Sequence, residues 1–437
     1  MKLHLPTRLR KALVATFVAV ASLATTLSTG TLVGGVAAVS LASVASAAVV
    51  GPAETYADGS LPDGIANAAT VTLTATEDTA WNVSSYKGLN ITIDAEDQDV
   101  KLTGRTNTND FDNNLDGVTA ASLWLADGGF LVNAANDVSG VSSIYLGGAQ
   151  MQFIGDQQLS NDFVLGACSA YTSEDSLSRA ALRIGHWQHT DKEVVLTGDV
   201  TVQENASIAF QHGCDLVFSG TLLGSGNLSM KIYNNSSYLK LAGDSSAYTG
   251  VVSADSTSIT LKLGNATAQT GGLNGSFAVG LDTVSASTLT LDVAESITLN
   301  HTGTVASGIS LVKNGAGTQS FTSALTGDVT VNGGSLILAS VAGNVIVNDG
   351  ASIKLASLNG LNSLVVKSGA TAYLPGVMVS STATSWAQGT SYYTAATGGI
   401  DTSLVTVEEG GTVVSSGGTI NAANANDLVY ADPTCLA

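Results

Sequence analysis

The chain has 437 residues, of which 12% are charged and 5% are aromatic, with 48 Gly and 5 Pro. Its hydrophobic fraction of 44% excludes a disordered chain, and the scarcity of aromatic residues favours a narrow core of many small aliphatic contacts. The net charge of −19 repels phosphate backbones and anionic membrane surfaces, so we expect no nucleic-acid partner.

The N-terminus predicts export. Four basic residues lie within the first 11 positions, and residues 12–47 carry no charge. Small residues at Val44–Ala47 fit a signal-peptidase site, so we expect an extended signal peptide over 1–47. The alternative is an uncleaved anchor, because the apolar run is long enough to span a bilayer. No later segment is apolar over about 18 residues, so we expect no transmembrane segment in the mature chain.

Short strands with alternating apolar residues follow along the chain. We expect a first part with longer loops over 48–193, a regular repeat over 194–414 and a C-terminal tail over 415–437. The strands with the clearest alternation are expected at 71–75, 90–94, 143–148, 258–263, 288–293 and 335–339. Only 176–184 is helix-like, and we interpret that stretch as a loop excursion.

An internal repeat dominates the second part. The heptapeptide LTGDVTV occurs at 196–202 and again at 325–331, and looser versions occupy 343–355, 364–374 and 405–414. In each, two apolar residues in alternation precede a turn residue. The turn residues are Asn205, Gly334, Gly350, Gly369 and Gly410, all of types that tolerate a positive φ. The last three steps between units are 16, 19 and 41 residues, and we interpret the longest as two turns.

This pattern predicts an all-β fold, a parallel β-solenoid. A strand this short cannot bury its apolar face alone, and stacking on the previous turn both pairs its backbone and completes a core. At roughly 20–23 residues per turn, the residues after 47 would make about 17–19 turns. The alternative is two or three β-sandwiches, whose strands are usually longer and carry larger core residues.

Two stretches, 220–256 and 311–340, resemble the autotransporter-associated β-strand repeats of bacterial autotransporter passengers. Gly224 and Gly226, then Tyr248–Gly250, then Gly315 and Gly317 match the turn positions of that family. The resemblance implies a right-handed parallel β-helix, a bacterial outer-membrane-associated setting and a role in adhesion. Autotransporters end in an outer-membrane barrel, and no room for one remains after Val414. We therefore expect either a separate export partner, a periplasmic protein or a secreted one.

A calcium site is one candidate. Asp112, Asn114 and Asp116, followed by Gly117, match the start of an EF-hand-type loop, and Asp110 adds a carboxylate. The twelfth position is Leu123, so the usual bidentate Glu is missing. The alternative is a solvated polar loop.

Two further clusters have both a chemical and a structural interpretation. The acids Asp94, Glu96, Asp97 and Asp99 lie near Lys101 and Arg105, as a lyase holding calcium beside an acidic sugar would require; the alternative is a charged outer face. His186, His189 and His212 could bind zinc with Cys214, or could lie in exposed loops. Cys168 and Cys214 could pair in an oxidising compartment, whereas a separation of two turns, roughly 9–10 Å, would exceed disulfide reach.

Aromatic residues gather near the C-terminus. Trp386, Tyr392 and Tyr393 stand in a Ser-, Thr- and Gly-rich stretch and are candidates for a glycan contact. The alternative is that they cap the end of the solenoid, which must be covered.

We expect an exported, non-enzymatic adhesin-like scaffold at the cell surface or outside the cell, with a host or cell-surface glycan or protein as partner and no cofactor other than a possible calcium ion. The alternatives are a β-helix polysaccharide lyase or hydrolase acting on an acidic glycan, and a glycan-binding module. A stacked trio of carboxylates beside a basic residue would favour the enzyme.

Overall fold

A computed structural model describes residues 57–58, 61, 65–66, 68–104, 113–166, 180–282, 287–374, 390–395, 400–401, 405–416 and 428–430. All of them belong to the larger of two units, Ser46–Ala437. Helix is limited in this part of the chain to one 3-10 turn, Ala135–Asp137. No helix in it is long and apolar enough to cross a membrane.

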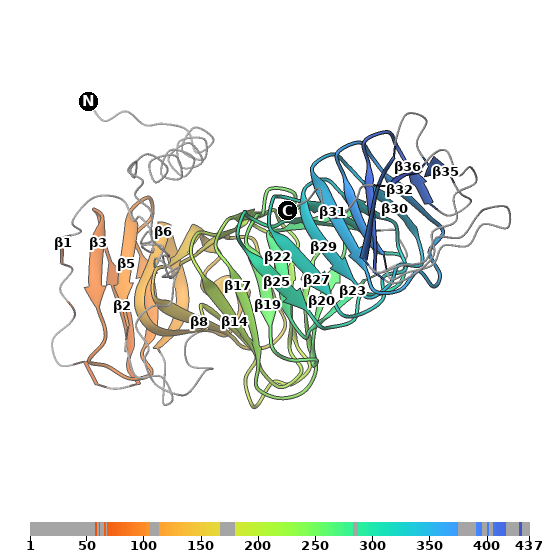
Figure 1. Ribbon diagram of the computed structural model, residues 1–437. Coiled ribbons are helices and arrows are strands. Elements are labelled where there is room, and N and C mark those ends of the chain that lie inside the picture. Colours follow the sequence, from red (N-terminus) through yellow and green to blue (C-terminus); the bar gives the residue numbers. More distant parts are fainter. Residues whose placement is uncertain are drawn as a thin grey trace, which may run out of the picture. The chain divides into compact units, whose positions relative to one another are not determined.

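The described residues form a β-solenoid of about 13 turns, which confirms the predicted all-β fold (Figure 1). Strands pair in parallel with the strand one turn earlier and one turn later. The first ladder joins β1 (Ala57–Asp58), β3 (Thr79–Asn82), β5 (Asp99–Thr103), β6 (Asn113–Val132), β7 (Gly140–Leu146), β10 (Asp162–Leu165), β13 (Val200–Val202) and β16 (Leu222–Gly224).

A second ladder continues from the last part of β6. It joins β8 (Ala149–Phe153), β11 (Leu182–Ile184), β14 (Ala206–Phe210), β17 (Leu228–Ile232), β19 (Val251–Ala254), β22 (Gly272–Gly275), β25 (Thr298–His301), β27 (Thr318–Phe321), β29 (Gly334–Leu338), β31 (Ala351–Leu355), β33 (Thr371–Leu374) and β37 (Thr412–Ser416). Near the N-terminus, β2 (Thr70–Thr74) pairs with β4 (Asn90–Asp94), and β4 pairs with the start of β6.

Two more ladders complete the turns. The third joins β9 (Gln157–Leu159), β12 (Glu193–Leu196), β15 (Asp215–Phe218), β18 (Ser237–Leu241), β20 (Ile259–Leu263) and β23 (Ala278–Leu281). The fourth joins β21 (Thr267–Thr270), β24 (Thr288–Asp292), β26 (Ser310–Asn314), β28 (Val329–Val331), β30 (Asn344–Val347), β32 (Ser363–Val366) and β36 (Val405–Val407). Because β12 spans the expected boundary at 193/194, both parts share one core.

All six strands with the clearest predicted alternation are present, in β2, β4, β7, β20, β24 and β29. The repeat places its apolar residues as expected, since Val329 pairs with Val345 and Val345 with Leu364, each buried. Alternate positions of these strands therefore form continuous aliphatic columns, in which each side chain packs on its counterpart one turn away. Such columns need only small residues, which is why the composition is poor in aromatics.

The predicted turn glycines also adopt the expected backbone. Gly334, Gly350, Gly369 and Gly410 have φ between +61° and +83°, the left-handed region that a residue with a Cβ enters at a cost. Asn205 differs, because it is not among the residues with a positive φ. Instead, its Oδ1 accepts a hydrogen bond from the Asn227 backbone N–H one turn later at 3.1 Å.

The two identical heptapeptides lie in different ladders but share two local features. Each begins with a leucine that pairs with a neighbouring turn, Leu196 in β12 and Leu325 in a bridge to Val341. A Cβ on the glycine of either copy, Gly198 or Gly327, would collide with a carbonyl oxygen of the previous turn. The glycine is thus retained because two backbones approach closely at this corner.

Three expectations about the turns of the solenoid were wrong. The solenoid has fewer turns than expected because some turns carry long excursions, such as the 37 residues from Phe163 to Val200. The 41-residue step from Leu364 to Val405 is one turn, because β32 pairs directly with β36. Part of the expected loop at 176–184 is strand β11, held between β8 and β14.

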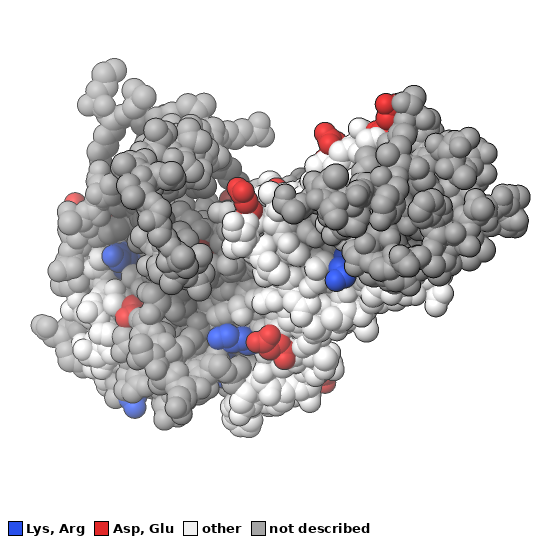
Figure 2. Space-filling model, in the orientation of Figure 1, with Lys and Arg blue, Asp and Glu red and all other residues white. Residues whose placement is uncertain are grey.

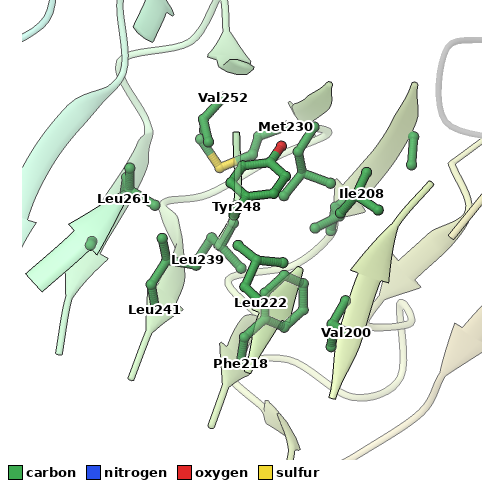
Figure 3. Packing of buried hydrophobic residues seen from close by; sticks show 14 of the residues in the cluster. Val200, Ile208, Phe218, Leu222, Met230, Leu239, Leu241, Tyr248, Val252 and Leu261 are labelled. Carbon is green, nitrogen blue, oxygen red and sulfur yellow. The ribbon is translucent and has the colours of Figure 1, made fainter. Parts of the chain in front are cut away.

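Tyr248, one of the residues that carry the family resemblance, is a core residue. Figure 3 shows its ring among Leu222, Leu239 and Val252. Its hydroxyl donates to the Gly226 carbonyl one turn earlier at 2.9 Å, so burial leaves no unsatisfied hydroxyl, and burial raises its pKa.

Lys313 interrupts one aliphatic column. It pairs with Leu291 and Val331, and its side chain is fully buried. Its Nζ donates to the carbonyl oxygens of Asn314 at 2.6 Å, Gly315 at 2.9 Å and Gly333 at 3.2 Å. Burial lowers its pKa to about 8, so it carries its charge at neutral pH and depends on these three acceptors.

His301 is a second buried ionisable group, between the rings of Phe277 and Phe321. Neither ring nitrogen has a hydrogen-bond partner among the described residues. Burial lowers its pKa to about 4. The imidazole is therefore neutral at physiological pH and acts as part of the aromatic core.

We predict that Val345→Ala lowers the free energy of unfolding by about 2 kcal/mol, because it leaves a cavity in the middle of a column. Ile346→Ala is the matched control, since Ile346 points outward on the same strand and is 38% exposed. We expect it to change the free energy of unfolding by less than about 0.5 kcal/mol. Urea denaturation measures both, and equal effects would contradict the assignment of inward and outward positions.

We predict an acid-sensitive stability from His301. Its folded-state pKa of about 4 lies below its ordinary value of 6.5, so the unfolded chain binds the proton first. Stability should fall as the pH drops from 6.5 to 4, by about 3 kcal/mol more than in His301→Leu. Urea denaturation of both chains at several pH values measures the difference, and parallel pH profiles would refute it.

Candidate functional site

The predicted calcium motif is partly described. Asp110 and Asp112 lie outside the described residues, whereas Asn114 and Asp116 lie on β6. Asp116 and Gly117 form a β-bulge against β4, and Gly117 has a φ of +86°. The described half of the motif is therefore a kinked strand, and the calcium site stays a prediction.

Asn114 takes part in a ladder of amide side chains. Its Nδ2 donates to the Asn90 Oδ1 at 3.0 Å, and its own Oδ1 accepts from the Asn133 Nδ2 at 3.2 Å. Each asparagine stands one turn from the next, so the ladder holds neighbouring turns together. This Oδ1, the atom that would bind calcium, already has a protein donor.

The predicted acidic cluster lies around the end of β4 and the start of β5. The Asp99 side chain accepts a hydrogen bond from the Ser122 hydroxyl one turn later at 2.6 Å, and Glu96 has a φ of +42°. Arg105, a candidate base, lies outside the described residues. The described hydrogen bond of Asp99 therefore connects its own turn to the next one.

The predicted aromatic site is described only as backbone. Trp386 lies outside the described residues. Tyr392 and Tyr393 lie in β34 (Thr390–Ala395), which runs antiparallel to β37 and to β38 (Leu428–Tyr430). A short strand, β35 (Ile400–Asp401), likewise runs antiparallel to β36. Antiparallel strands here cover the edges of the last parallel strands, as a cap does.

A different group of aromatic residues is exposed, where the second ladder turns into the third. The loops after β11, β14 and β17 are neighbours there. We call His186, Trp187, His189, His212 and Tyr233 the aromatic–histidine corner. Trp187 is 67% exposed and Tyr233 is 60% exposed, the highest values among the large hydrophobic residues described.

The three loops of this corner hold one another in place. The Gln211 N–H donates to the Ile184 carbonyl at 2.9 Å, and the Tyr233 N–H donates to the Phe210 carbonyl at 3.0 Å. The Cys214 Sγ lies 3.3 Å from the His189 carbonyl oxygen, to which it donates. These contacts fix the loops at the spacing of the strands, so the exposed rings stand on a defined surface.

The corner also holds its backbone in an uncommon conformation. Asp191, His212 and Asn235 have φ values of +54°, +55° and +61°, and they occur in three successive turns. A left-handed conformation is enriched in Asn, Asp and His but still costs energy. At His212, the His212 N–H donates to the Asn234 Oδ1 at 2.7 Å, which helps to hold it.

The chain passes from this corner into an outward-facing row on the third ladder. Asp156 precedes β9, and Glu193, Asp215 and Tyr238 follow in register on β12, β15 and β18. The Glu193 N–H donates to Asp156 and the Tyr238 N–H donates to Asp215, at 2.9 and 2.8 Å. The Tyr238 hydroxyl donates to the Glu193 carboxylate. Three carboxylates therefore stack in successive turns.

A lysine flanks this row. The Lys262 Nζ lies 3.4 Å from the centre of the Tyr238 ring, a cation–π contact. Burial raises the pKa of Asp215 to about 6, while Lys262 opposes that rise. Burial and the bond to Glu193 raise the pKa of Tyr238, so its hydroxyl keeps its proton. The row therefore offers acids of unequal strength beside a cation.

No described residues form a group of three or more His, Cys, Asp or Glu side chains arranged for a metal ion. This finding includes the predicted zinc ligands His186, His189, His212 and Cys214, all of which are described. Cys214 is buried and is a free thiol, and Cys168 lies outside the described residues.

Sequence reasoning did not single out Trp187, Tyr233, Glu193 or Asp215. Their shared surface depends on the register between β12, β15 and β18. Aligning turns at the 22-residue spacing of Val194 and Leu216 brings Glu193 beside Asp215. Repeat analysis confined to the glycine turns could not have shown this, because these residues lie outside the repeated motif.

Charged side chains are few and scattered on the described surface that Figure 2 shows.

We predict that Lys262→Gln raises the pKa of Asp215 further, because it removes a positive charge that lowers this pKa. A carboxyl NMR titration of Asp215 measures the shift. Lys354→Gln, on β31 and outside the row, is the control and should leave the titration unchanged. An Asp215 pKa that falls in Lys262→Gln would contradict the described geometry.

Comparisons of the chain with protein-family models, with curated proteins and with solved structures found no match.

Proposed function

We propose that this chain is an exported, non-enzymatic bacterial surface scaffold with an adhesive role, built on a β-solenoid. The observation that carries the proposal is the register of the core, in which inward side chains stack turn on turn through one continuous cluster. A stack of this kind resists bending because every turn is fixed by two neighbours. The charged and apolar organisation of residues 1–47 supports export.

The architecture suits adhesion through repetition. Each turn displaces its outward residues by one strand spacing, about 4.8 Å, so loops at one corner form a regular array. Weak contacts made by several loops at once add up to a strong attachment without any deep pocket. The resemblance of 220–256 and 311–340 to autotransporter repeats supports the same setting, with a separate export partner and a glycan or protein on another cell as the ligand.

One observation favours a second candidate, a polysaccharide lyase or hydrolase. Asp156, Glu193 and Asp215 form a stacked trio of carboxylates beside Lys262 and Tyr238. That is the arrangement expected of an enzyme acting on an acidic glycan. Each of these groups also has a structural partner, which is why we place the scaffold first.

We predict that export removes residues 1–47. Mass spectrometry of the protein from its native cells should find a mature N-terminus at Ala48, and protease added to intact cells should degrade it. Ala47→Glu should block cleavage, because the peptidase requires small residues. A cytoplasmic chain that keeps Met1 would end the surface proposal.

We predict that the mature chain does not cleave acidic polysaccharides. Incubation with polygalacturonate, followed by assays for unsaturated products and for new reducing ends, should show neither. Cleavage that disappears in the double variant Glu193→Gln, Asp215→Asn would establish the enzyme instead of the scaffold. Asp199→Asn, outside the carboxylate row, is the matched control.

A further inference from the structure

The second ladder is weakened at one place, between β22 and β25. β19 pairs with β22 at four positions and β25 pairs with β27 at four, whereas β22 pairs with β25 only through Gly275 and His301. Directly after that pair, the Thr302 N–H donates to the Gly275 carbonyl oxygen at 2.8 Å. We call this place, where Gly272–Gly275 faces Thr298–His301, the seam.

Side chains fill the seam where backbone pairing is missing. The Gln319 Oε1 accepts a hydrogen bond from the Leu273 N–H at 3.1 Å, and its Nε2 donates to the Leu273 carbonyl oxygen at 2.9 Å. Gln319 lies on β27, two turns from Leu273, so its amide reaches past β25. A Cβ on Gly272 would lie 2.2 Å from the Leu299 Cδ1, so the Leu299 side chain occupies the space beside β22.

The other sides of the same two turns are held more firmly. β20 pairs with β23 at four positions, and β21 pairs with β24 at four. Opening the seam therefore breaks one backbone pair and the bonds of Gln319, whereas separating the two turns completely breaks these two ladders as well. A local opening of this kind costs less free energy than global unfolding.

The single backbone pair of the seam contains a buried histidine. The His301 ring centre lies 4.8 Å from that of Phe277 and 5.5 Å from that of Phe321. Neither ring nitrogen has a hydrogen-bond partner among the described residues. Protonation would give the ring two N–H donors and a charge with no acceptor around it in this part of the core. A charged imidazole is therefore more stable in water than in the core.

Burial is the one cause that lowers the pKa of His301, to about 4. His301 is the only titratable residue on β22, β23, β25 and β27. The charged residues on the adjoining segments, none of which shifts this pKa, are Asp282, Asp292, Glu295 and Lys313. In an open seam the ring regains its ordinary pKa of 6.5, so the open state binds the proton first. Opening thus becomes more favourable as the pH falls from 6.5 to 4.

We propose that the seam is an acid-sensitive opening point in the wall of the solenoid. Protonation of His301 draws its ring out from between Phe277 and Phe321 and breaks the one backbone pair that joins β22 to β25, while the turns on both sides stay folded. This goes beyond the scaffold proposal, because it gives the rod one place at which it opens and one condition that opens it.

The test is hydrogen exchange with mass spectrometry on the full mature chain at pH 7 and pH 4.5. The exchange rate of each peptide is divided by the rate of an unstructured peptide at the same pH. We expect protection at 272–281 and 298–302 to fall about fiftyfold at pH 4.5, the ratio that pKa values of 6.5 and about 4 give. Protection of β17 and β30, on either side, should change by less than about threefold.

Two variants separate the histidine from the rest of the seam. His301→Leu should remove the difference in protection between the two pH values, because leucine does not titrate. His189→Gln, in the loop after β11, is the matched control and should keep the wild-type difference. Gln319→Leu should lower protection of the seam at both pH values and keep the difference between them, because it removes the bonds to Leu273 but leaves His301 in place.

Three outcomes overturn the proposal. Equal loss of protection in the seam and in β17 and β30 would show that acid unfolds the whole solenoid, and an unchanged seam at pH 4.5 would show that it does not open. A full pH difference in His301→Leu would assign the effect to another group. The wild-type comparison needs no variant, so it stands if His301→Leu fails to fold, which circular dichroism detects. None of these outcomes touches the scaffold proposal, because export is measured independently.

Discussion

The structure depends on backbone pairing between successive turns. A strand of three to five residues, such as β28 or β31, cannot bury its apolar face or satisfy its own N–H and C=O groups. Each strand solves both problems by lying on the strand one turn earlier, which aligns inward residues into columns. Where a glycine such as Gly198 or Gly327 stands at a corner, it allows the backbones of two turns to approach closely enough to keep this pairing.

The columns explain which substitutions the fold tolerates and which ones destabilise it. Small aliphatic residues fill most positions, and substitutions matter where a polar group replaces one of them. Lys313 and His301 show two solutions, one with three carbonyl acceptors around a charged amine and one with a neutral imidazole between phenyl rings. Gln319 shows a third, because its amide bonds both the N–H and the C=O of Leu273 at 3.1 and 2.9 Å. It thereby replaces a peptide group where two strands of the same ladder, β22 and β25, pair only at Gly275 and His301.

Sequence predicted the fold well and the site poorly, for one physical reason. Alternation in segments such as 90–94 and glycine turns such as Gly350 are local signals, so they identified strands and turns. Register between turns is not local: the 41-residue step at β36 and the meeting of Glu193 with Asp215 depend on how much chain leaves the stack in each turn. Trp187 and Tyr233 share a surface only through that register. Composition could not show it either, because a few aromatic residues contribute little to an average.

The most direct test of turn-to-turn stacking uses the 41-residue step from Leu364 to Val405, which the sequence pattern wrongly predicted as two turns. Val365 and Thr406 are outward register partners on β32 and β36, and Ile346 and Val365 are the corresponding pair one turn earlier. Nitroxide labels at either pair should show strong dipolar broadening, since adjacent strands lie roughly 5 Å apart. Broadening at Ile346 and Val365 but not at Val365 and Thr406 would place a further turn between β32 and β36. Its absence at both pairs would contradict the stacked solenoid itself.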